Sequence, residues 1–119
     1  MRDFRDLKVW QKAYALTLAT YRATKEFPRE EQFGLTSQVR RAAASIVANI
    51  AEGCGRDGEA ELARFCQIAM GSASELECEL MLTRDLGFLQ SDDHERLTND
   101  VTQVKRMLTS LLRKLRAER

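Results

Sequence analysis

The sequence predicts an all-α protein, an antiparallel up-down-up-down four-helix bundle, and three observations lead to this fold class. Of its 119 residues, 44% are hydrophobic and 31% charged, with one proline and six glycines, a composition typical of helical globular proteins. Breaks occur at Phe27 and Pro28, at 53–58 and at Gly87, and the four segments between them have a helical period. The short connections favour antiparallel neighbours. We expect residues 1–119 to form a single domain.

The first predicted helix, residues 6–26, is apolar over too wide an angle for one seam. One stripe consists of Leu7, Trp10, Tyr14, Thr17, Leu18 and Tyr21. A second stripe beside it consists of Val9, Ala13, Leu16 and Ala23. Two hypotheses follow: both stripes pack inside one bundle, or one of them faces another subunit.

The second predicted helix, residues 35–52, has three different faces. Its core stripe consists of Leu35, Val39, Ala42, Ala43, Ile46 and Ile50. A separate polar stripe consists of Gln38, Arg41, Ser45, Asn49 and Glu52. Solvated faces usually carry Lys and Glu, so we expect this polar stripe to be buried or interfacial, with charge partners for Arg41 and Glu52. We interpret it as architectural. The third face combines small residues with one long cation: Arg40, Ala44, Ala48 and Ala51.

The third predicted helix, residues 59–86, has an uninterrupted core stripe. Its members are Leu62, Phe65, Ala69, Ala73, Leu76, Leu80 and Thr83. Small residues occupy positions 71–74, and a glycine in mid-helix costs about 1 kcal/mol relative to alanine. This run predicts a close approach of a neighbouring helix, against which the adjacent apolar face could be buried. That face contains Ile68, Leu82 and Leu86.

The fourth predicted helix, residues 92–116, separates apolar from basic side chains most clearly. Its core stripe consists of Leu97, Val101, Val104, Met107, Leu108, Leu111, Leu112 and Leu115. The candidate residues for nucleic-acid or partner binding are the cations of its other side, joined by one from the second helix: Lys105, Arg106, Arg113, Lys114, Arg116 and Arg40. The alternative is structural, because acidic residues begin this helix and basic ones end it, which matches the helix dipole.

Net charge is only +1, but it is unevenly distributed along the chain. Residues 1–58 carry +3, residues 59–100 carry −7 and residues 101–119 carry +5. We expect a cytoplasmic protein without membrane association, since the sequence contains neither a signal-peptide pattern nor a long apolar run. With three cysteines and no Cys-x-x-Cys pair, we expect reduced thiols. Cys66 should be buried, and Cys54, in a predicted loop, should be exposed and oxidisable.

The sequence does not predict an enzyme. Di-metal bundles need Glu-x-x-His pairs, whereas the only histidine, His94, lies in a polar helix start. Glu75, Glu77 and Glu79 resemble the acidic rows that hold Mg²⁺ in all-α nucleotide pyrophosphohydrolases, but such a site needs matching carboxylates from a second helix. We therefore expect no catalytic residue, metal, cofactor or small-molecule substrate. A Mg²⁺-dependent nucleotide hydrolase that uses this row is the alternative.

Five sequence elements in order resemble one known family. They are Phe4-x-x-Leu7-x-Val9-Trp10-x-x-Ala13, Phe27-Pro28, Gln38-x-Arg40-Arg41-Ala42, Ser45-x-x-x-Asn49-Ile50-Ala51-Glu52-Gly53, and Ala69-x-Gly71-Ser72 followed by Glu75-Leu76. Together they are similar to the four-helix-bundle proteins of the 23S rRNA intervening-sequence family. The resemblance implies a ring-like homopentamer with no established catalytic activity and a largely undefined cellular role.

Better-understood relatives of that family are similar to the accessory variability determinant of diversity-generating retroelements, a basic pentamer that associates with a reverse transcriptase and nucleic acid. This chain is near neutral, so the resemblance alone does not imply nucleic-acid binding. The leading hypothesis is a non-enzymatic oligomeric scaffold whose grouped cations contact RNA, DNA or an acidic protein. The alternative is a module that binds only other proteins.

Overall fold

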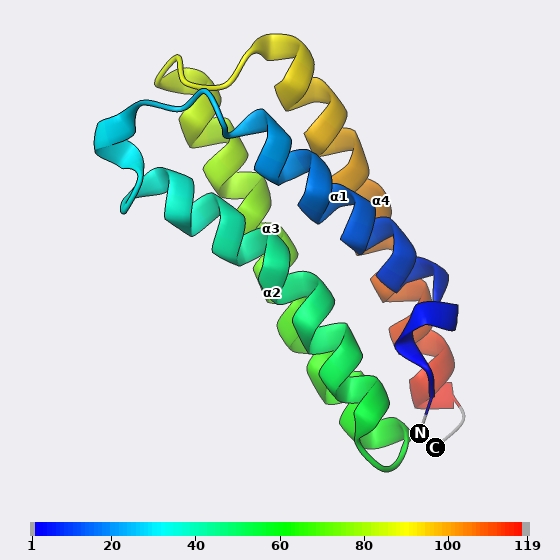
Figure 1. Ribbon diagram of the computed structural model, residues 1–119. Helices are drawn as coiled ribbons and strands as arrows, with labels where there is room; N and C mark the ends of the chain where they lie inside the picture. Colours follow the sequence, from blue (N-terminus) through cyan, green and yellow to red (C-terminus); the bar gives the residue numbers. More distant parts are fainter. Residues whose placement is uncertain (1, 118–119) are drawn as a thin grey trace.

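Four long helices follow one another in the order α1 (Lys8–Ala23), α2 (Leu35–Gly55), α3 (Glu59–Asp85) and α4 (Ser91–Ala117), with 3-10 turns η1 (Phe4–Asp6) and η2 (Arg29–Glu31) before α1 and α2. This computed structural model describes residues 2–117, so residues 1, 118 and 119 of the predicted domain lie outside the described residues. Figure 1 shows each helix running opposite to the one before it. The predicted all-α four-helix bundle is confirmed.

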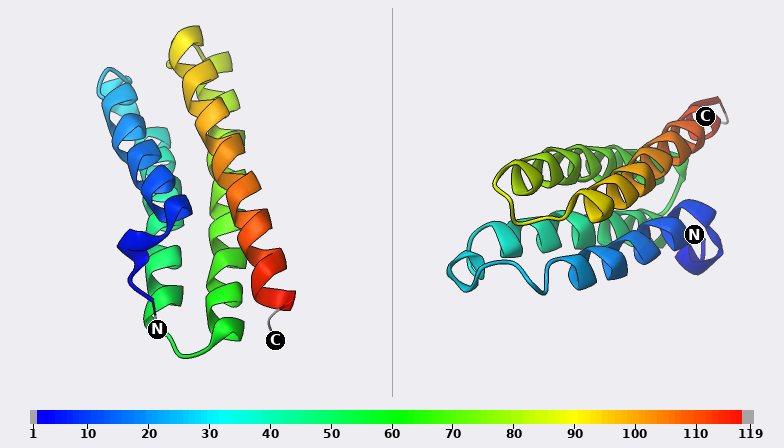
Figure 2. Two further views of the ribbon diagram at one scale, coloured as in Figure 1. Left: turned by 90° about the vertical axis from the view of Figure 1, so that its right-hand side faces the viewer. Right: turned by 90° about the horizontal axis from the view of Figure 1, so that it is seen from above.

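The helices form two hairpins that lie side by side. Figure 2 shows α1 next to α2 and α3 next to α4. Because α2 also contacts α3 and α4 also contacts α1, the helices α1 and α3 stand on one diagonal of the bundle. The bundle measures 46 × 23 × 20 Å along its principal axes. Each helix therefore has two neighbours and one side that faces outward.

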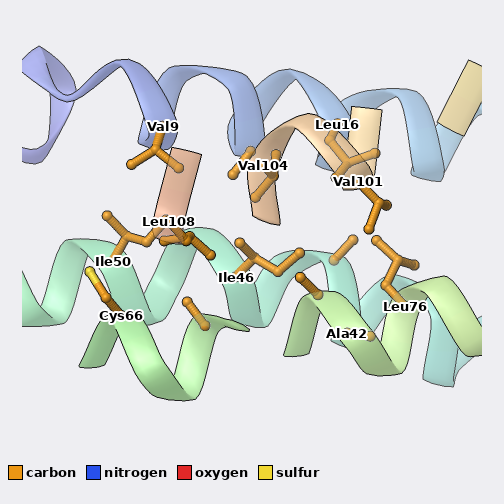
Figure 3. Packing of buried hydrophobic residues seen from close by; sticks show 14 of the residues in the cluster. Val9, Leu16, Ala42, Ile46, Ile50, Cys66, Leu76, Val101, Val104 and Leu108 are labelled. Atoms are coloured by element: carbon orange, nitrogen blue, oxygen red, sulfur yellow. The ribbon is translucent and has the colours of Figure 1, made fainter. Parts of the chain in front are cut away.

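The core lies along the bundle axis and receives side chains from all four helices (Figure 3). α1 contributes Val9, Ala13 and Leu16, which confirms one of its two predicted stripes as core. The core residues predicted for α3 are all buried, and burying one large aliphatic side chain stabilises the fold by about 1.5–3 kcal/mol. Among the described helices, none is both long and apolar enough to cross a bilayer.

The predicted helix bounds hold within about three residues, with one correction that matters. α2 continues through Gly53 and Cys54 to Gly55, where the sequence predicted a loop. Gly53 is buried against α3: a methyl group at this position would lie 2.8 Å from Phe65 Cβ and 3.1 Å from Leu62 Cδ1. Tertiary packing of this last turn therefore outweighs the low helix propensity of glycine.

The sequence predicted that a neighbouring helix approaches α3 closely at residues 71–74, and α2 does so at only some of these positions. Ser72 and Ala73 are buried, and Ser72 Oγ lies 2.9 Å from Ser45 Oγ of α2. Gly71 is exposed, and a methyl group there would meet no atom within 4 Å. Within the described residues, the tightest glycine contact between α2 and α3 is thus at Gly53, and the prediction for Gly71 is wrong for a single chain.

Candidate functional site

A groove between α3 and α4 brings together three of the predicted binding residues. Lys105, Arg106 and Arg113 line it, and the space measures about 490 Å³. Three hydroxyl side chains of α4 share the same wall: Thr102, Thr109 and Ser110. These residues come together because α4 turns about 100° per residue, which places positions three, four, seven and eight apart on one side. We call this the α3–α4 groove.

One cation of the α3–α4 groove is neutralised by the opposite helix. Lys105 Nζ forms an ion pair with Glu77 Oε1 of α3 at 3.0 Å. Arg106 and Arg113 are exposed and form no ion pair within residues 2–117. The groove therefore offers two guanidinium groups that have no ion-pair partner among the described residues, together with several hydroxyl groups, and this set suits phosphate oxygens.

The other predicted binding residues lie elsewhere. Lys114 and Arg116 are exposed in the last turn of α4 but do not line the α3–α4 groove. Arg40 belongs to a different part of the bundle, where its Nε donates to Thr24 Oγ1 at 2.8 Å and its guanidinium lies over the Tyr21 ring. Arg40 thus joins α2 to α1 and is not part of the basic set of α4.

The polar stripe of α2 forms a connected network only at its centre. Asn49 Nδ2 donates to Ser45 O at 2.8 Å and lies 3.0 Å from Ser45 Oγ, which in turn contacts Ser72. Glu52 pairs with Arg56, the residue that follows α2, at 2.8 Å. Gln38 and Arg41 are exposed at the outer surface, where they line a hollow of about 380 Å³ together with Ala42, Ser45 and Glu75 of α3. In one chain the stripe is half exposed, not buried.

The acidic row of α3 does not bring its three carboxylates to one side of the helix. Successive members are two residues apart, so helical rotation turns them about 200° from each other. Glu77 points to α4 and pairs with Lys105, whereas Glu75 lines the hollow beside α2. In the described part of the chain, no group of three or more His, Cys, Asp and Glu side chains is arranged to hold a metal ion.

Glu79, the third member of that row, is buried, which the sequence analysis did not predict. Glu79 is 7% exposed, and its Oε1 has no hydrogen-bond partner among the described residues. Burial raises the pKa of Glu79 to about 7, and the negative charge of Glu75 and a hydrogen bond with it act in the same direction. The sequence does contain a sign of this burial: on a helical projection, Glu79 lies only about 60° from the core position Leu76.

The three thiols differ in access to solvent, and the prediction for Cys54 is wrong. Cys54 is 2% exposed in the last turn of α2, because the helix extends past the predicted loop. Burial raises the pKa of Cys54, and it raises the pKa of Cys66 to about 11. Cys78 is exposed on α3. The burial predicted for Cys66 is confirmed.

Comparison with known proteins decides the family. The sequence model of the 23S rRNA-intervening sequence protein family matches residues 5–110. The chain belongs to this family. The match includes the aromatic residues of α1, the whole of α2 and α3, and most of α4, with every residue of the α3–α4 groove except Arg113. No curated protein matches the chain.

A solved structure supports this placement in the 23S rRNA-intervening sequence protein family. The bundle is similar to a protein of unknown function from the S23 ribosomal protein family of Bacteroides thetaiotaomicron, with a TM-score of 0.81 and 25% sequence identity. The likeness covers 88% of this chain and 95% of the other. The comparisons therefore identify the fold and the family and indicate no enzymatic family.

Proposed function

We propose that this member of the 23S rRNA-intervening sequence protein family is a non-enzymatic scaffold that assembles into a homopentamer and binds nucleic acid through the α3–α4 groove. The observation that carries the proposal is the convergence of Arg106, Arg113 and Lys105 on one open groove. Cations in such a groove attract the phosphate backbone, and repeated copies multiply a modest affinity.

Two uncovered apolar patches support assembly. Tyr14, Leu18 and Tyr21 of α1 are each more than two-fifths exposed, and we call them the α1 patch. A second set is equally exposed, and we call it the α3 patch: Leu82 in the last turn of α3 and Leu86 just after it, with Ile68 about 21 Å further back along the same helix. Large exposed apolar side chains grouped on one face indicate a protein contact, because leaving them in water costs free energy.

The positions of the two patches favour a ring. In a ring, each subunit uses one surface to contact the next subunit and a different surface to contact the previous one. The α1 patch and the α3 patch lie on helices that stand diagonally across the bundle, so they are two different surfaces. An α1 patch that packs on the α3 patch of the next copy gives such a head-to-tail contact, in line with the homopentamer that the family resemblance implies.

The chemistry of the groove indicates contact with the backbone of a nucleic acid, without base recognition. Its lining contains no aromatic side chain among the described residues, so bases have no ring on which to stack. Lys and Arg contacts to phosphates release counterions, which makes binding fall steeply with salt. The preferred ligand is therefore a structured RNA or DNA bound without sequence preference.

A second candidate function is a module that binds only proteins. The ion pair between Lys105 and Glu77 favours it, because one of the three groove cations is already neutralised within the chain. In that case the uncovered apolar patches would carry the interaction, and affinity for a partner would depend little on salt.

The test is the solution mass by light scattering at low and high salt, with and without a short structured RNA. We expect an oligomer near five chains that persists at high salt, and a gain of mass with RNA that high salt abolishes. The double variant Arg106→Glu with Arg113→Glu should keep the oligomer and lose RNA. A matched control, Lys8→Glu with Arg96→Glu, reverses two exposed charges outside the α3–α4 groove and outside both apolar patches and should keep both properties.

Assembly and nucleic-acid binding are contradicted by different results of this experiment. A monomer at all salt concentrations contradicts the ring. An oligomer that ignores RNA, or that loses RNA equally in the control variant, contradicts the α3–α4 groove as the binding surface and leaves the module that binds only proteins.

A further inference from the structure

A second basic pocket lies at the opposite hairpin, where the connection from α1 to α2 folds over the end of the bundle. Lys25 and Arg29 come from this connection, and Arg40 comes from the second turn of α2. The pocket measures about 280 Å³ and is also lined by the polar side chains of Thr24, Gln32 and Thr36. It shares no residue with the α3–α4 groove.

The charges of this α1–α2 pocket are unbalanced. No acidic side chain lines it, and within residues 2–117 Lys25, Arg29 and Arg40 form no ion pair. The nearby Glu31 carboxylate is turned to the start of α2, where its Oε1 accepts a hydrogen bond from the Leu35 amide at 3.1 Å. Three cations held around one small space repel each other, and an anion seated between them removes this repulsion.

One of the three cations is held in a fixed geometry. The Arg40 Nε donates to Thr24 Oγ1 at 2.8 Å, its Nη2 donates to the Tyr21 carbonyl at 3.3 Å, and its Cζ lies 4.8 Å from the Tyr21 ring centre. The side chain of Thr24 is itself buried and donates to the Thr20 carbonyl. The remaining N–H groups of Arg40 are thus preorganised, and little rotamer entropy is lost when they bind a ligand.

The inner wall of the pocket adds a hydroxyl group whose hydrogen bond the fold does not make. Thr36 is 8% exposed, and its Oγ1 has no partner among the described residues. In a helix, a threonine hydroxyl commonly donates to the carbonyl four residues earlier, but Thr36 is the second residue of α2 and no helical carbonyl precedes it there. A buried hydroxyl without a partner costs free energy, which an oxygen that enters the pocket would recover.

We propose that the α1–α2 pocket binds a phosphate group, carried by inorganic phosphate or by a small phosphomonoester. A tetrahedral dianion suits two guanidinium groups, one ammonium group and the Gln32 amide better than a flat carboxylate does, because its oxygens accept hydrogen bonds from several directions. The site is independent of the proposed nucleic-acid function, since its residues lie on the other hairpin.

Titration calorimetry of the full-length protein with inorganic phosphate tests this site. We expect saturable one-to-one binding per chain that competes with a phosphomonoester such as glycerol phosphate. The double variant Lys25→Gln with Arg29→Gln removes two exposed cations that make no hydrogen bond to the fold, and should weaken binding at least about tenfold. Arg22→Gln, an exposed cation of α1 outside the pocket, should change it less than about twofold. Thermal unfolding of both variants shows that the bundle is intact.

A third variant and a competition experiment with RNA test whether the pocket is specific for phosphate. Arg40→Lys keeps the charge but loses the fork held by Thr24, and should also weaken phosphate binding. Phosphate at saturation should leave RNA binding unchanged, whereas displacement of phosphate by RNA would assign the pocket to the polymer and overturn the proposal. Non-saturable heats, or equal weakening in the Arg22→Gln control, would overturn it as well, because they indicate a diffuse charge effect.

Discussion

Glu79 shows how a single buried carboxyl group makes the stability of this bundle depend on pH. It lies on α3 with Glu75 of the same helix beside it, and Glu75 lines a hollow together with Arg41 of α2. Because burial raises the pKa of Glu79 from 4.5 to about 7, the folded protein holds a proton that the unfolded chain releases. The group therefore stabilises the fold most below pH 4.5, and this stabilisation is lost as pH rises through 7.

The variant Glu79→Gln should remove this dependence. Glutamine carries no charge, so the variant should match the wild type in acid and exceed its free energy of unfolding at pH 8 by up to about 3 kcal/mol. Urea unfolding at several pH values measures the difference. The control Glu95→Gln, at an exposed position of α4, should leave the slope unchanged. A wild type whose stability does not fall between mildly acidic and neutral pH would contradict this reading of Glu79.

The contact between helices α2 and α3 depends on the position of one glycine, and the other glycines of these two helices do not take part in it. Gly53 is covered by Phe65 and Leu62 of α3, whereas Gly55 and Gly71 have nothing within 4 Å of an added methyl group. Of these three glycines, only Gly53 therefore limits how closely the two helices pack. This contact also carries the last turn of α2 beyond its predicted end and buries Cys54.

Substitution of the two glycines at the end of α2 separates packing from helix propensity. Gly53→Ala should lower the free energy of unfolding by about 1–3 kcal/mol, because overpacking forces the helices apart. Gly55→Ala, two residues later, should be neutral or stabilising by up to about 1 kcal/mol, because alanine favours the helix. Denaturant unfolding of both variants measures this. Equal effects of the two substitutions would show that Gly53 does not set the helix spacing.

For the whole molecule, the outer surface is as informative as the core. The bundle buries one stripe of α1 and leaves the α1 patch, which is part of the other stripe, about half exposed. Phe33, in the connection between α1 and α2, is 91% exposed. Apolar side chains that contribute so little to their own bundle are typical of surfaces that a partner covers.

An aspartate placed in either apolar patch should break the proposed ring into monomers, and mixing the two variants tests whether the contact is head-to-tail. Leu18→Asp disrupts the α1 patch and Leu82→Asp disrupts the α3 patch, and neither should cost the single bundle more than about 0.5 kcal/mol because both positions are exposed. Each variant alone should be monomeric in light scattering. Mixed, they should form a heterodimer, because one chain keeps an intact α1 patch and the other keeps an intact α3 patch.

The mixture distinguishes a head-to-tail contact from other assemblies. A two-fold symmetric contact would pair one patch with the same patch of a second copy, so the variant that leaves this patch intact would still dimerise alone and the mixture would gain nothing. A pentamer that persists in either variant would place the subunit contact on another face of the bundle.

The sequence predicted the element pattern well because helical period and glycine or proline breaks are local properties. The core stripes of α3 and α4 follow directly from that period. The α3 stripe is buried throughout, and the α4 stripe is buried except for Met107 and Leu111, which are partly buried. The candidate site was predicted less completely. Lys105, Arg106 and Arg113 do share a groove, but the period of α4 could not show that Glu77 of α3 neutralises Lys105. Nor could it show that Arg40 is bound to Thr24 of α1.

By itself, the sequence determined the four amphipathic helices, their order and their membership of the 23S rRNA-intervening sequence protein family. Only the tertiary structure decided which faces are covered. It placed Glu79 and Cys54 in the interior, left Gly71 open and put three cations around the α1–α2 pocket. The physical reason is that period and propensity act along one chain segment, whereas burial, charge pairing and pKa depend on what a neighbouring helix places opposite.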